Sequence, residues 1–489
     1  MFNRHAFSIN LLFLLVISLI SISTAQDRPR DVKMSKEQAQ ERKELAEMQN
    51  KILRDKFDIL LPQIMREHEI DMWIHIVREG DLDPLGYNFG SNEGIFIFTD
   101  RGGDRIERAF FGFHSDKVEE SSAYDIIIRP EIKIPLEAYP NIRILLDELY
   151  RMGGAEWPGG PKTELDFRFN GIGEFVAERD PKRIAVNYLE ELGSAIFYEI
   201  PRLRPDGISL TDYNLLVKAL GNIYAGRIIS SEYLIVDYFA RPVLSEFDLY
   251  KRIRSDIDEK QKKALSSIVR GVTRVNDLGR ERSAVDKNGR RQRGDYVIQG
   301  GELLILTDGR QSGGFLGHGW KYGNYHEDID AYAYVLQEGE TEPPTHIKRF
   351  WNNVMKVRTI IENNVRVGRT AGATFEILKQ KLEKAGMINS DIQRYDRSKH
   401  PDKIWVSLDM HAAGSGLYAP RIGPLGPDWQ RDIKLPMYHH FYFEFFIDMP
   451  MPEWGEGRSL RVRFHDGAMA TESGVKYFFP YPREISLIR

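Results

Sequence analysis

The sequence predicts an α+β protein with two domains, and three features support this expectation. The chain has 489 residues, which is more than one typical domain contains. Up to about residue 245, apolar runs rich in β-branched and aromatic residues alternate with helical patterns, as in an α/β domain. A long charged helical pattern at 247–269 then precedes a second group of strand patterns. We therefore expect domains at 26–245 and 246–489.

The composition limits the classes of function. Hydrophobic residues make up 42% of the chain and charged residues 29%, which suits a globular protein with a sizeable core. The net charge is −4, so the basic excess typical of nucleic-acid-binding proteins is missing, and we expect no nucleic-acid partner. Cysteine is absent. Any metal site must therefore use histidine, aspartate and glutamate.

The first residues have the pattern of a signal peptide. Arg4 precedes an apolar run from Leu11 to Ile20, and Ser23-Thr-Ala25 supplies small residues for cleavage before Gln26. The apolar run is too short to cross a bilayer comfortably. We therefore expect residues 1–25 to be removed and the mature chain to be exported, to the periplasm or the cell exterior. The alternative is an uncleaved membrane anchor.

The expected elements of the first domain follow from residue spacing. Residues 35–69 carry apolar side chains at helical intervals, which predicts an amphipathic helix that packs on a sheet. The other expected elements are strands at 71–78, 94–100 and 183–187, helices at 142–152 and 211–220, and a loop rich in Gly and Pro at 153–161.

The second domain is organised around a strand, loop, strand pattern. A glycine-rich insert separates the first strand, Gly301–Gly309, from the second, His326–Leu336. Three later segments belong with them: Ser407–Gly414, His440–Glu444 and Arg463–Asp466. In order and content these five segments resemble the metal-binding half of the pita-bread hydrolases, the family of aminopeptidase P, prolidase and creatinase. The resemblance covers about residues 40 to 489. It implies a creatinase-like N-terminal α/β domain followed by a pita-bread domain.

The resemblance also implies a dinuclear metal site. In this family two divalent ions share a bridging water, and the ligands are two Asp, one His and two Glu from different strands. Carboxylate-rich ligand sets of this kind suit Mn, Co or Zn. The implied partner is a peptide substrate or ligand. A homodimer is also implied, because pita-bread proteins with this N-terminal domain are commonly dimers.

The two aspartate positions of the family match this sequence unequally. Laid without a gap, the first family strand places its aspartate on Thr307, and Asp308 comes one residue later. Side chains alternate between the faces of a strand, so this shift turns the carboxylate away unless a bulge restores it. Asp308 is thus either a possible ligand or a turn residue before Gly309. The second aspartate falls on Asp328, with Asp330 on the same face.

The histidine segment matches the family only at its second histidine. The family pattern lies ungapped on residues 404–414, and Ile404, which has no lone pair to donate, occupies the metal-ligand position. His411 then matches the catalytic histidine that contacts substrate and helps proton transfer. If the family pattern is instead shifted along the sequence so that its metal-ligand histidine falls on residue 411, His411 itself is a metal ligand. The adjacent His439 and His440 face opposite ways on a strand and cannot chelate one ion together.

Glu444 and His465 complete the set of candidate ligands. Glu444 matches the first family glutamate and lies in an aromatic strand, where a lone carboxylate is costly to bury without a partner or a cation. His465 occupies the position of the bridging glutamate. Asp328, Glu444 and His465 can hold one ion with water completing its shell. His318 and His326 in the insert either rebuild a different site or are ordinary surface residues.

These residues lead to three functional hypotheses. The first is an exported Xaa-Pro aminopeptidase-like enzyme in which the candidate ligands bind a divalent metal and His411 aids the tetrahedral intermediate. The second is a relative without catalysis that binds peptide, because only Asp328 and Glu444 remain of the five expected ligands; it needs no metal. The third is a creatinase-like hydrolase in which His411 acts with His465 or with a histidine of the insert. One fold serves all three, and fold alone does not choose between them.

Overall fold

The computed structural model describes most of the chain after residue 34. The described residues are 35–78, 83–112, 115–129, 167–192, 207–279, 281–308, 325, 327, 329–390, 397–412, 419–425, 427–479 and 482–489. Outside them lie the expected signal peptide, the expected helix and loop within 142–161, and three candidate residues: His318, His326 and Asp328. The chain divides into two compact units, Met1–Ala46 and Glu47–Arg489. The described part of the first unit is the start of helix α2 (Lys36–Asp55).

The helix expected at 35–69 is present as three consecutive helical segments. Helix α2 leads into a π-helical turn, η1 (Lys56–Leu60), and then into α3 (Leu61–Glu67). Phe57 and Ile64 are fully buried, as the amphipathic pattern predicts. The irregular turn was not predicted. It immediately precedes Pro62, which has no N–H with which to continue the regular backbone ladder.

The first sheet confirms the strands expected from apolar runs. Its six strands lie in the order β4-β3-β2-β1-β5-β6, and β1 is buried along its whole length. The expected strands at 71–78, 94–100 and 183–187 correspond to β1, β2 and β5, and the expected helix at 211–220 to α8. The elements of this region are β1 (Met72–Val77), α4 (Pro84–Phe89), β2 (Gly94–Asp100), β3 (Ile106–Phe111), α5 (Asp116–Ser121), β4 (Ile126–Ile128), η3 (Phe167–Phe169), α7 (Ile172–Arg179), β5 (Ile184–Val186), α8 (Leu210–Ala225), β6 (Ile228–Ser230) and α9 (Glu232–Ala240).

The second region begins with the long helix expected at 247–269, which is α10 (Glu246–Ser266). The domain boundary expected near residue 245 falls between α9 and α10 and stays a prediction. A five-stranded sheet has the order β20-β10-β9-β7-β8 and a four-stranded sheet the order β11-β12-β16-β17. Their strands are β7 (Arg282–Val285), β8 (Arg291–Gln292), β9 (Leu303–Asp308), β10 (Ile329–Val335), β11 (Met387–Asn389), β12 (Ile404–Leu408), β16 (Phe445–Pro450), β17 (Ser459–Phe464) and β20 (Ser486–Ile488).

Two smaller sheets lie next to these strands in the chain. They have the orders β15-β18-β19 and β13-β14. The remaining elements are η6 (Val275–Leu278), α11 (Thr345–Asn364), α12 (Ala371–Lys384), η7 (Arg397–Lys399), β13 (Met410–His411), β14 (Arg421–Ile422), α13 (Asp428–Asp432), β15 (His440–Tyr442), η8 (Pro452–Trp454), β18 (Gly467–Thr471) and β19 (Gly474–Tyr477).

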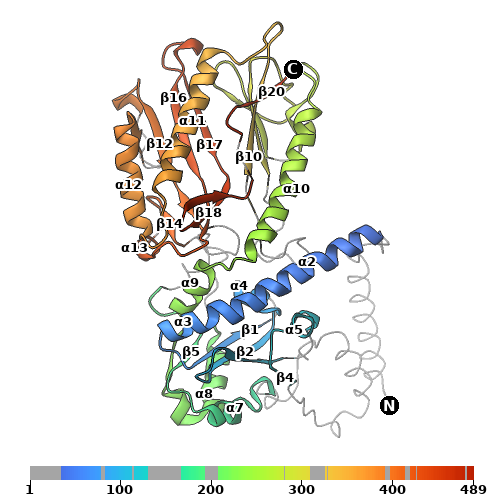
Figure 1. Ribbon diagram of the computed structural model, residues 1–489, viewed down its shortest axis with the longest axis vertical. Helices are drawn as coiled ribbons and strands as arrows, with labels where there is room; N and C mark the ends of the chain where they lie inside the picture. Colours follow the sequence, from blue (N-terminus) through green and yellow to red (C-terminus); the bar gives the residue numbers. More distant parts are fainter. Residues whose placement is uncertain are drawn as a thin grey trace, which may run out of the picture. The chain divides into compact units, whose positions relative to one another are not determined.

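Helices α11 and α12 cover the four-stranded sheet. They lie beside β12, β16 and β17 (Figure 1) and turn their apolar sides toward these strands. Phe350, Val354 and Val357 of α11 are fully buried, at the helical spacing of one face. They belong to one hydrophobic cluster that also contains Val406 of β12. Buried apolar side chains of α12, β16 and β17 complete this cluster. This packing fixes one face of the sheet and leaves the other face for the candidate site.

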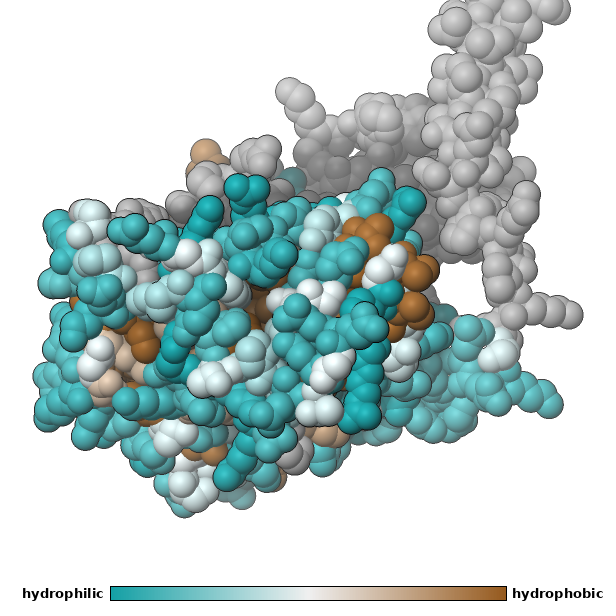
Figure 2. Space-filling model, turned by 90° about the horizontal axis from the view of Figure 1, so that it is seen from above, coloured by the Kyte–Doolittle hydropathy of each residue, from teal (hydrophilic) through white to brown (hydrophobic). Residues whose placement is uncertain are grey.

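One face of the described residues is mainly polar. Figure 2 shows a face on which hydrophilic side chains predominate and apolar ones form only small areas. Among the described residues, no helix has both the length and the apolar character required to cross a bilayer.

A buried carboxylate joins both long helices to the strands. Asp466, at the turn between β17 and β18, forms ion pairs with Arg254 of α10 and with Arg358 of α11, the latter at 3.0 Å. All three side chains are at least nine-tenths buried. Burial alone would raise the pKa of Asp466, but the charges and hydrogen bonds of the two arginines outweigh it and lower that pKa.

We predict that Asp466→Asn destabilises the fold by about 3–5 kcal/mol, because it leaves two guanidinium groups buried without a counter-charge. Chemical denaturation at neutral pH measures this loss. Because the folded pKa of Asp466 is lowered, its contribution is complete above the unfolded pKa of about 3.9 and is lost as pH falls further. The difference between wild type and variant should therefore shrink below about pH 4.

The matched control is Glu453→Gln. Glu453 pairs with Arg349 at 2.9 Å on the surface, where solvent screens the charges. Its replacement should cost about 1 kcal/mol or less. Equal losses for the two variants would contradict the central role given to Asp466.

Candidate metal centre

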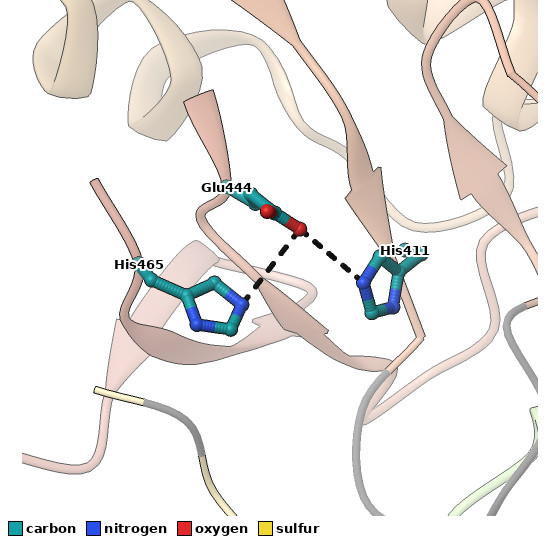
Figure 3. A group of neighbouring side chains, drawn as sticks. All are labelled: His411, Glu444 and His465. Atoms are coloured by element: carbon teal, nitrogen blue, oxygen red, sulfur yellow. Dashed lines mark ion pairs between the residues drawn. The ribbon is translucent and has the colours of Figure 1, made fainter. Parts of the chain in front are cut away.

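Three candidate residues from separate segments converge where strands end. His411 is the last residue of β13, Glu444 lies between β15 and β16, and His465 lies between β17 and β18. Figure 3 shows the two imidazole rings on either side of the Glu444 carboxylate. The side chains of His411 and Glu444 are 12% and 15% exposed, and that of His465 is 3% exposed. The three side chains are therefore mostly buried and do not lie on an open surface.

Backbone hydrogen bonds hold these strand ends together. The N–H of Asp409 donates to the carbonyl of Glu444 at 3.0 Å, and the N–H of Phe443 donates to the carbonyl of Asp466 at 2.7 Å. Asp409 also accepts two hydrogen bonds from the guanidinium group of Arg421, both at 2.7 Å. Paired bonds of this kind fix orientation as well as distance. The residues on either side of the three candidates are thus rigidly placed.

The distances among the three donor atoms suit a single metal ion. Nε2 of His411 lies 3.4 Å from Oε2 of Glu444, and Nε2 of His465 lies 3.8 Å from the same oxygen. All three donor atoms lie within 4.8 Å of one another. Ligands at about 2.0–2.2 Å from one ion lie on the order of 3–4 Å apart, so these distances are compatible with joint binding.

The electrostatics of the group favour a charged carboxylate. Burial alone would raise the pKa of Glu444, but the hydrogen bond from His411 and the charges of His465, His411 and Arg463 lower it to about 2. Burial alone would lower the pKa of His411. The hydrogen bond and the negative charge of Glu444 outweigh burial, so the pKa of His411 is raised. Glu444 is therefore ionised, and its charge is balanced by the positive groups that lower its pKa.

Hydrogen bonding leaves both imidazoles with nitrogen atoms suited to a metal. Nδ1 of His411 lies 2.8 Å from the carbonyl oxygen of Ala412, which can only accept, so Nδ1 carries the proton. If the ring is neutral, the lone pair of Nε2 faces the lone pairs of the Glu444 carboxylate. Lone pairs repel each other, so a proton or a cation is needed between Nε2 of His411 and Oε2 of Glu444. Neither ring nitrogen of His465 has a hydrogen-bond partner among the described residues. Buried polar atoms are almost always paired, so His465 has the geometry of a metal ligand.

The other positions of the family pattern contribute no further described donor to this group. Ile404 packs against the hydrophobic cluster beneath the sheet. Thr307 donates a hydrogen bond to Asp330 directly opposite it on β10, at 2.5 Å. Asp308 is the last residue of β9, and its side chain, like the whole of Asp328, lies outside the described residues. The two aspartates therefore stay predictions as ligands.

Sequence reasoning missed a second polar group beside the three donors. Asp330 accepts hydrogen bonds from Thr307 and from the hydroxyl of Tyr332, the latter at 2.9 Å. Arg463 lies between the two carboxylates, 3.5 Å from Asp330 and 3.9 Å from Glu444. The signal was available in the sequence, because Asp330 lies two residues after the candidate Asp328 and Arg463 lies two residues before His465.

The histidine pair at 439 and 440 behaves as the strand alternation predicts. His439 stacks on Phe441, whereas His440 contacts Tyr250 and lies 2.7 Å from a carboxylate oxygen of Glu327. The two rings face different surroundings and do not form a joint metal site.

We predict that His465→Ala lowers the affinity for a divalent ion by at least about 100-fold, since the removal of even an outer partner of a metal ligand costs 10–100-fold. Calorimetric titration with Mn, Co or Zn measures the change. His400→Ala is the control, because His400 is exposed and its ring lies beside Trp405, outside the group of three donors. Undiminished binding by the His465 variant would exclude this group as the metal site.

Comparisons with known proteins identify the fold. No family model matches the sequence, and no curated protein matches it either. Among solved structures, the X-Pro aminopeptidase of Thermotoga maritima MSB8 has a TM-score of 0.52 at 14% identity, over 87% of this chain and 100% of that chain. The Xaa-Pro dipeptidase of Bacillus anthracis has a TM-score of 0.49 at 15% identity, over 90% and 99%. The expected fold class is confirmed: the chain has the mixed α/β architecture of the pita-bread aminopeptidases and prolidases.

Proposed function

We propose that this chain is a single-metal peptidase that removes N-terminal residues from peptides, in the manner of an Xaa-Pro aminopeptidase. The convergence of His411, Glu444 and His465 within 4.8 Å carries the proposal. Two histidines and one carboxylate with open positions are a ligand set found in hydrolytic zinc sites. The fold shared with an X-Pro aminopeptidase supports a peptide as the substrate.

The three donors would hold the ion, which supplies Lewis acidity toward a peptide carbonyl. His411 serves as a ligand in this arrangement, in line with the shifted reading of its segment. Its ring is oriented by the carbonyl of Ala412, which keeps Nε2 directed at the site. Arg463 lies beside the Glu444 carboxylate and, after His411 and His465, helps to keep that carboxylate ionised. Its other N–H groups are in position to donate to an oxygen on which negative charge develops.

The described residues support one ion in preference to two. The carboxylate of Asp330 already accepts bonds from Thr307 and Tyr332 and lies beside Arg463. The guanidinium of Arg463 places a positive charge between Asp330 and Glu444, where a second dication would be repelled. Manganese, cobalt and zinc all suit the remaining set.

A second candidate function is peptide binding without hydrolysis. Ile404 supports it, because this aliphatic residue packs in the core at the position where the family pattern has a histidine ligand. A centre with so altered a ligand set can keep the cleft and lose turnover.

We also propose that the chain is exported and acts as a homodimer. Export is supported by the apolar run from Leu11 to Ile20 and the small residues before Gln26. The dimer is supported by the resemblance to pita-bread proteins with this type of N-terminal domain.

The decisive experiment combines metal analysis with hydrolysis of Xaa-Pro peptides in the presence of Mn, Co or Zn. We expect about one ion per chain and turnover that Glu444→Gln reduces by at least about 100-fold in kcat/KM. Glu472→Gln is the control, because Glu472 is an exposed carboxylate in the turn between β18 and β19.

Two bound ions would contradict the single-metal assignment. Peptide binding without metal or turnover would favour the second candidate function.

A further inference from the structure

A basic hairpin lies at the edge of the five-stranded sheet, and none of its residues belongs to the group of three candidate metal ligands. Strands β7 and β8 are joined by a turn, and four cations lie along the hairpin: Lys287, Arg290, Arg291 and Arg293. The carboxylate of Asp286 does not neutralise them directly. It accepts hydrogen bonds from the backbone N–H groups of residues 288 and 290 and from Gln292. Its role is to form the turn.

The strand register places Arg291 on the same side of the sheet as Asp330. Arg291 is opposite Val285, Val285 is opposite Leu303, and Leu303 is opposite Tyr334. Residues directly opposite in a sheet share a face, as do residues two apart in a strand. Tyr334, Tyr332 and Asp330 therefore share their face with Arg291. The polar group beside the metal centre and Arg291 thus lie on the same face of the sheet.

Electrostatic coupling agrees with this placement. Burial is the largest influence that lowers the pKa of Arg291, and the positive charges of Arg293 and Arg463 lower it further. Asp330 acts in the opposite direction. Arg291 is therefore close enough to Asp330 and Arg463 to sense the charge of each.

The guanidinium groups of Arg291 and Arg293 have N–H donors that no described acceptor binds. Within the described part of the chain, the side chains of Arg291 and Arg293 form neither hydrogen bonds nor ion pairs, and both residues keep part of their surface in solvent. Among the described residues, Arg463 forms ion pairs with two carboxylates, Asp330 at 3.5 Å and Glu444 at 3.9 Å. Arg291 and Arg293 are like charges without a close counter-charge among the described residues, so they repel each other. An anionic group on a ligand would relieve that repulsion.

We propose that Arg291 and Arg293 bind a carboxylate of the peptide, so that the site takes acidic peptides in preference to neutral ones. This inference rests on the proposed function, since it assumes that the cleft receives a peptide. The planar fork of a guanidinium matches a carboxylate with two parallel hydrogen bonds. The carboxylate belongs either to an Asp or Glu side chain or to the C-terminus of the peptide.

The test is a binding titration of the full chain with four peptides of one Xaa-Pro series. They carry a neutral residue or Glu after proline, and each has a free or an amidated C-terminus. We expect the neutral amide to bind at least about tenfold more weakly than the best anionic peptide, with a preference that decreases as salt rises. The double variant Arg291→Gln/Arg293→Gln should remove this preference and leave binding of the neutral amide unchanged.

Lys287→Gln/Arg290→Gln is the matched control, because it removes the same charge from exposed positions of the same hairpin. It should keep the preference. A preference that depends on the Glu side chain, or one that depends on the free C-terminus, supports the proposal and identifies the source of the carboxylate. Equal affinity for all four peptides, or equal effects of the two double variants, would overturn it.

The readout separates this proposal from the proposed function. Binding of acidic peptides through Arg291 and Arg293 without any turnover would remove the peptidase assignment and keep the carboxylate site. Efficient turnover combined with equal affinity for all four peptides, both unaffected by the Arg291→Gln/Arg293→Gln variant, would do the reverse.

Discussion

The ion pairs of Asp466 with Arg254 and Arg358 are the interaction on which the second region depends. They bind α10 and α11 to the turn between β17 and β18 in a buried place where an unpaired charge would be very costly. The same residue accepts a backbone hydrogen bond from Phe443 through its carbonyl. Because His465 precedes Asp466 and Glu444 follows Phe443, a structural ion pair determines where two of the three donors lie.

The candidate site uses the places where regular pairing stops. Glu444 and His465 each lie between two strands that belong to different sheets, and His411 ends a strand of two residues. Side chains at such positions are released from the alternation that a continuous ladder imposes. This freedom lets residues from three segments point at one another, while the buried network around Asp466 and the Asp409–Arg421 pair keeps their backbones in place.

The charges of the described residues bear on how many ions the proposed centre would hold. Among the described residues, one ionised carboxylate and two imidazoles surround the candidate metal position. The next carboxylate, Asp330, is engaged by Thr307, Tyr332 and Arg463. A guanidinium thus provides positive charge close to where a second ion would be needed. The same group, together with the arginines of β8, makes the surroundings attractive to an anionic ligand.

The sequence by itself determined the positions of β1, β2, β9, β10 and α10, because apolar runs and helical spacing are local properties of the chain. It also pointed to His411, Glu444 and His465, through the order of short segments that resemble a family pattern. It did not reveal the engagement of Asp330 by Thr307 and Arg463, or the face on which Arg291 lies. Those depend on which residues stand opposite each other after the strands have paired, and a register shift of one residue would reverse every face. Only the tertiary structure decides that register, and therefore which donors meet.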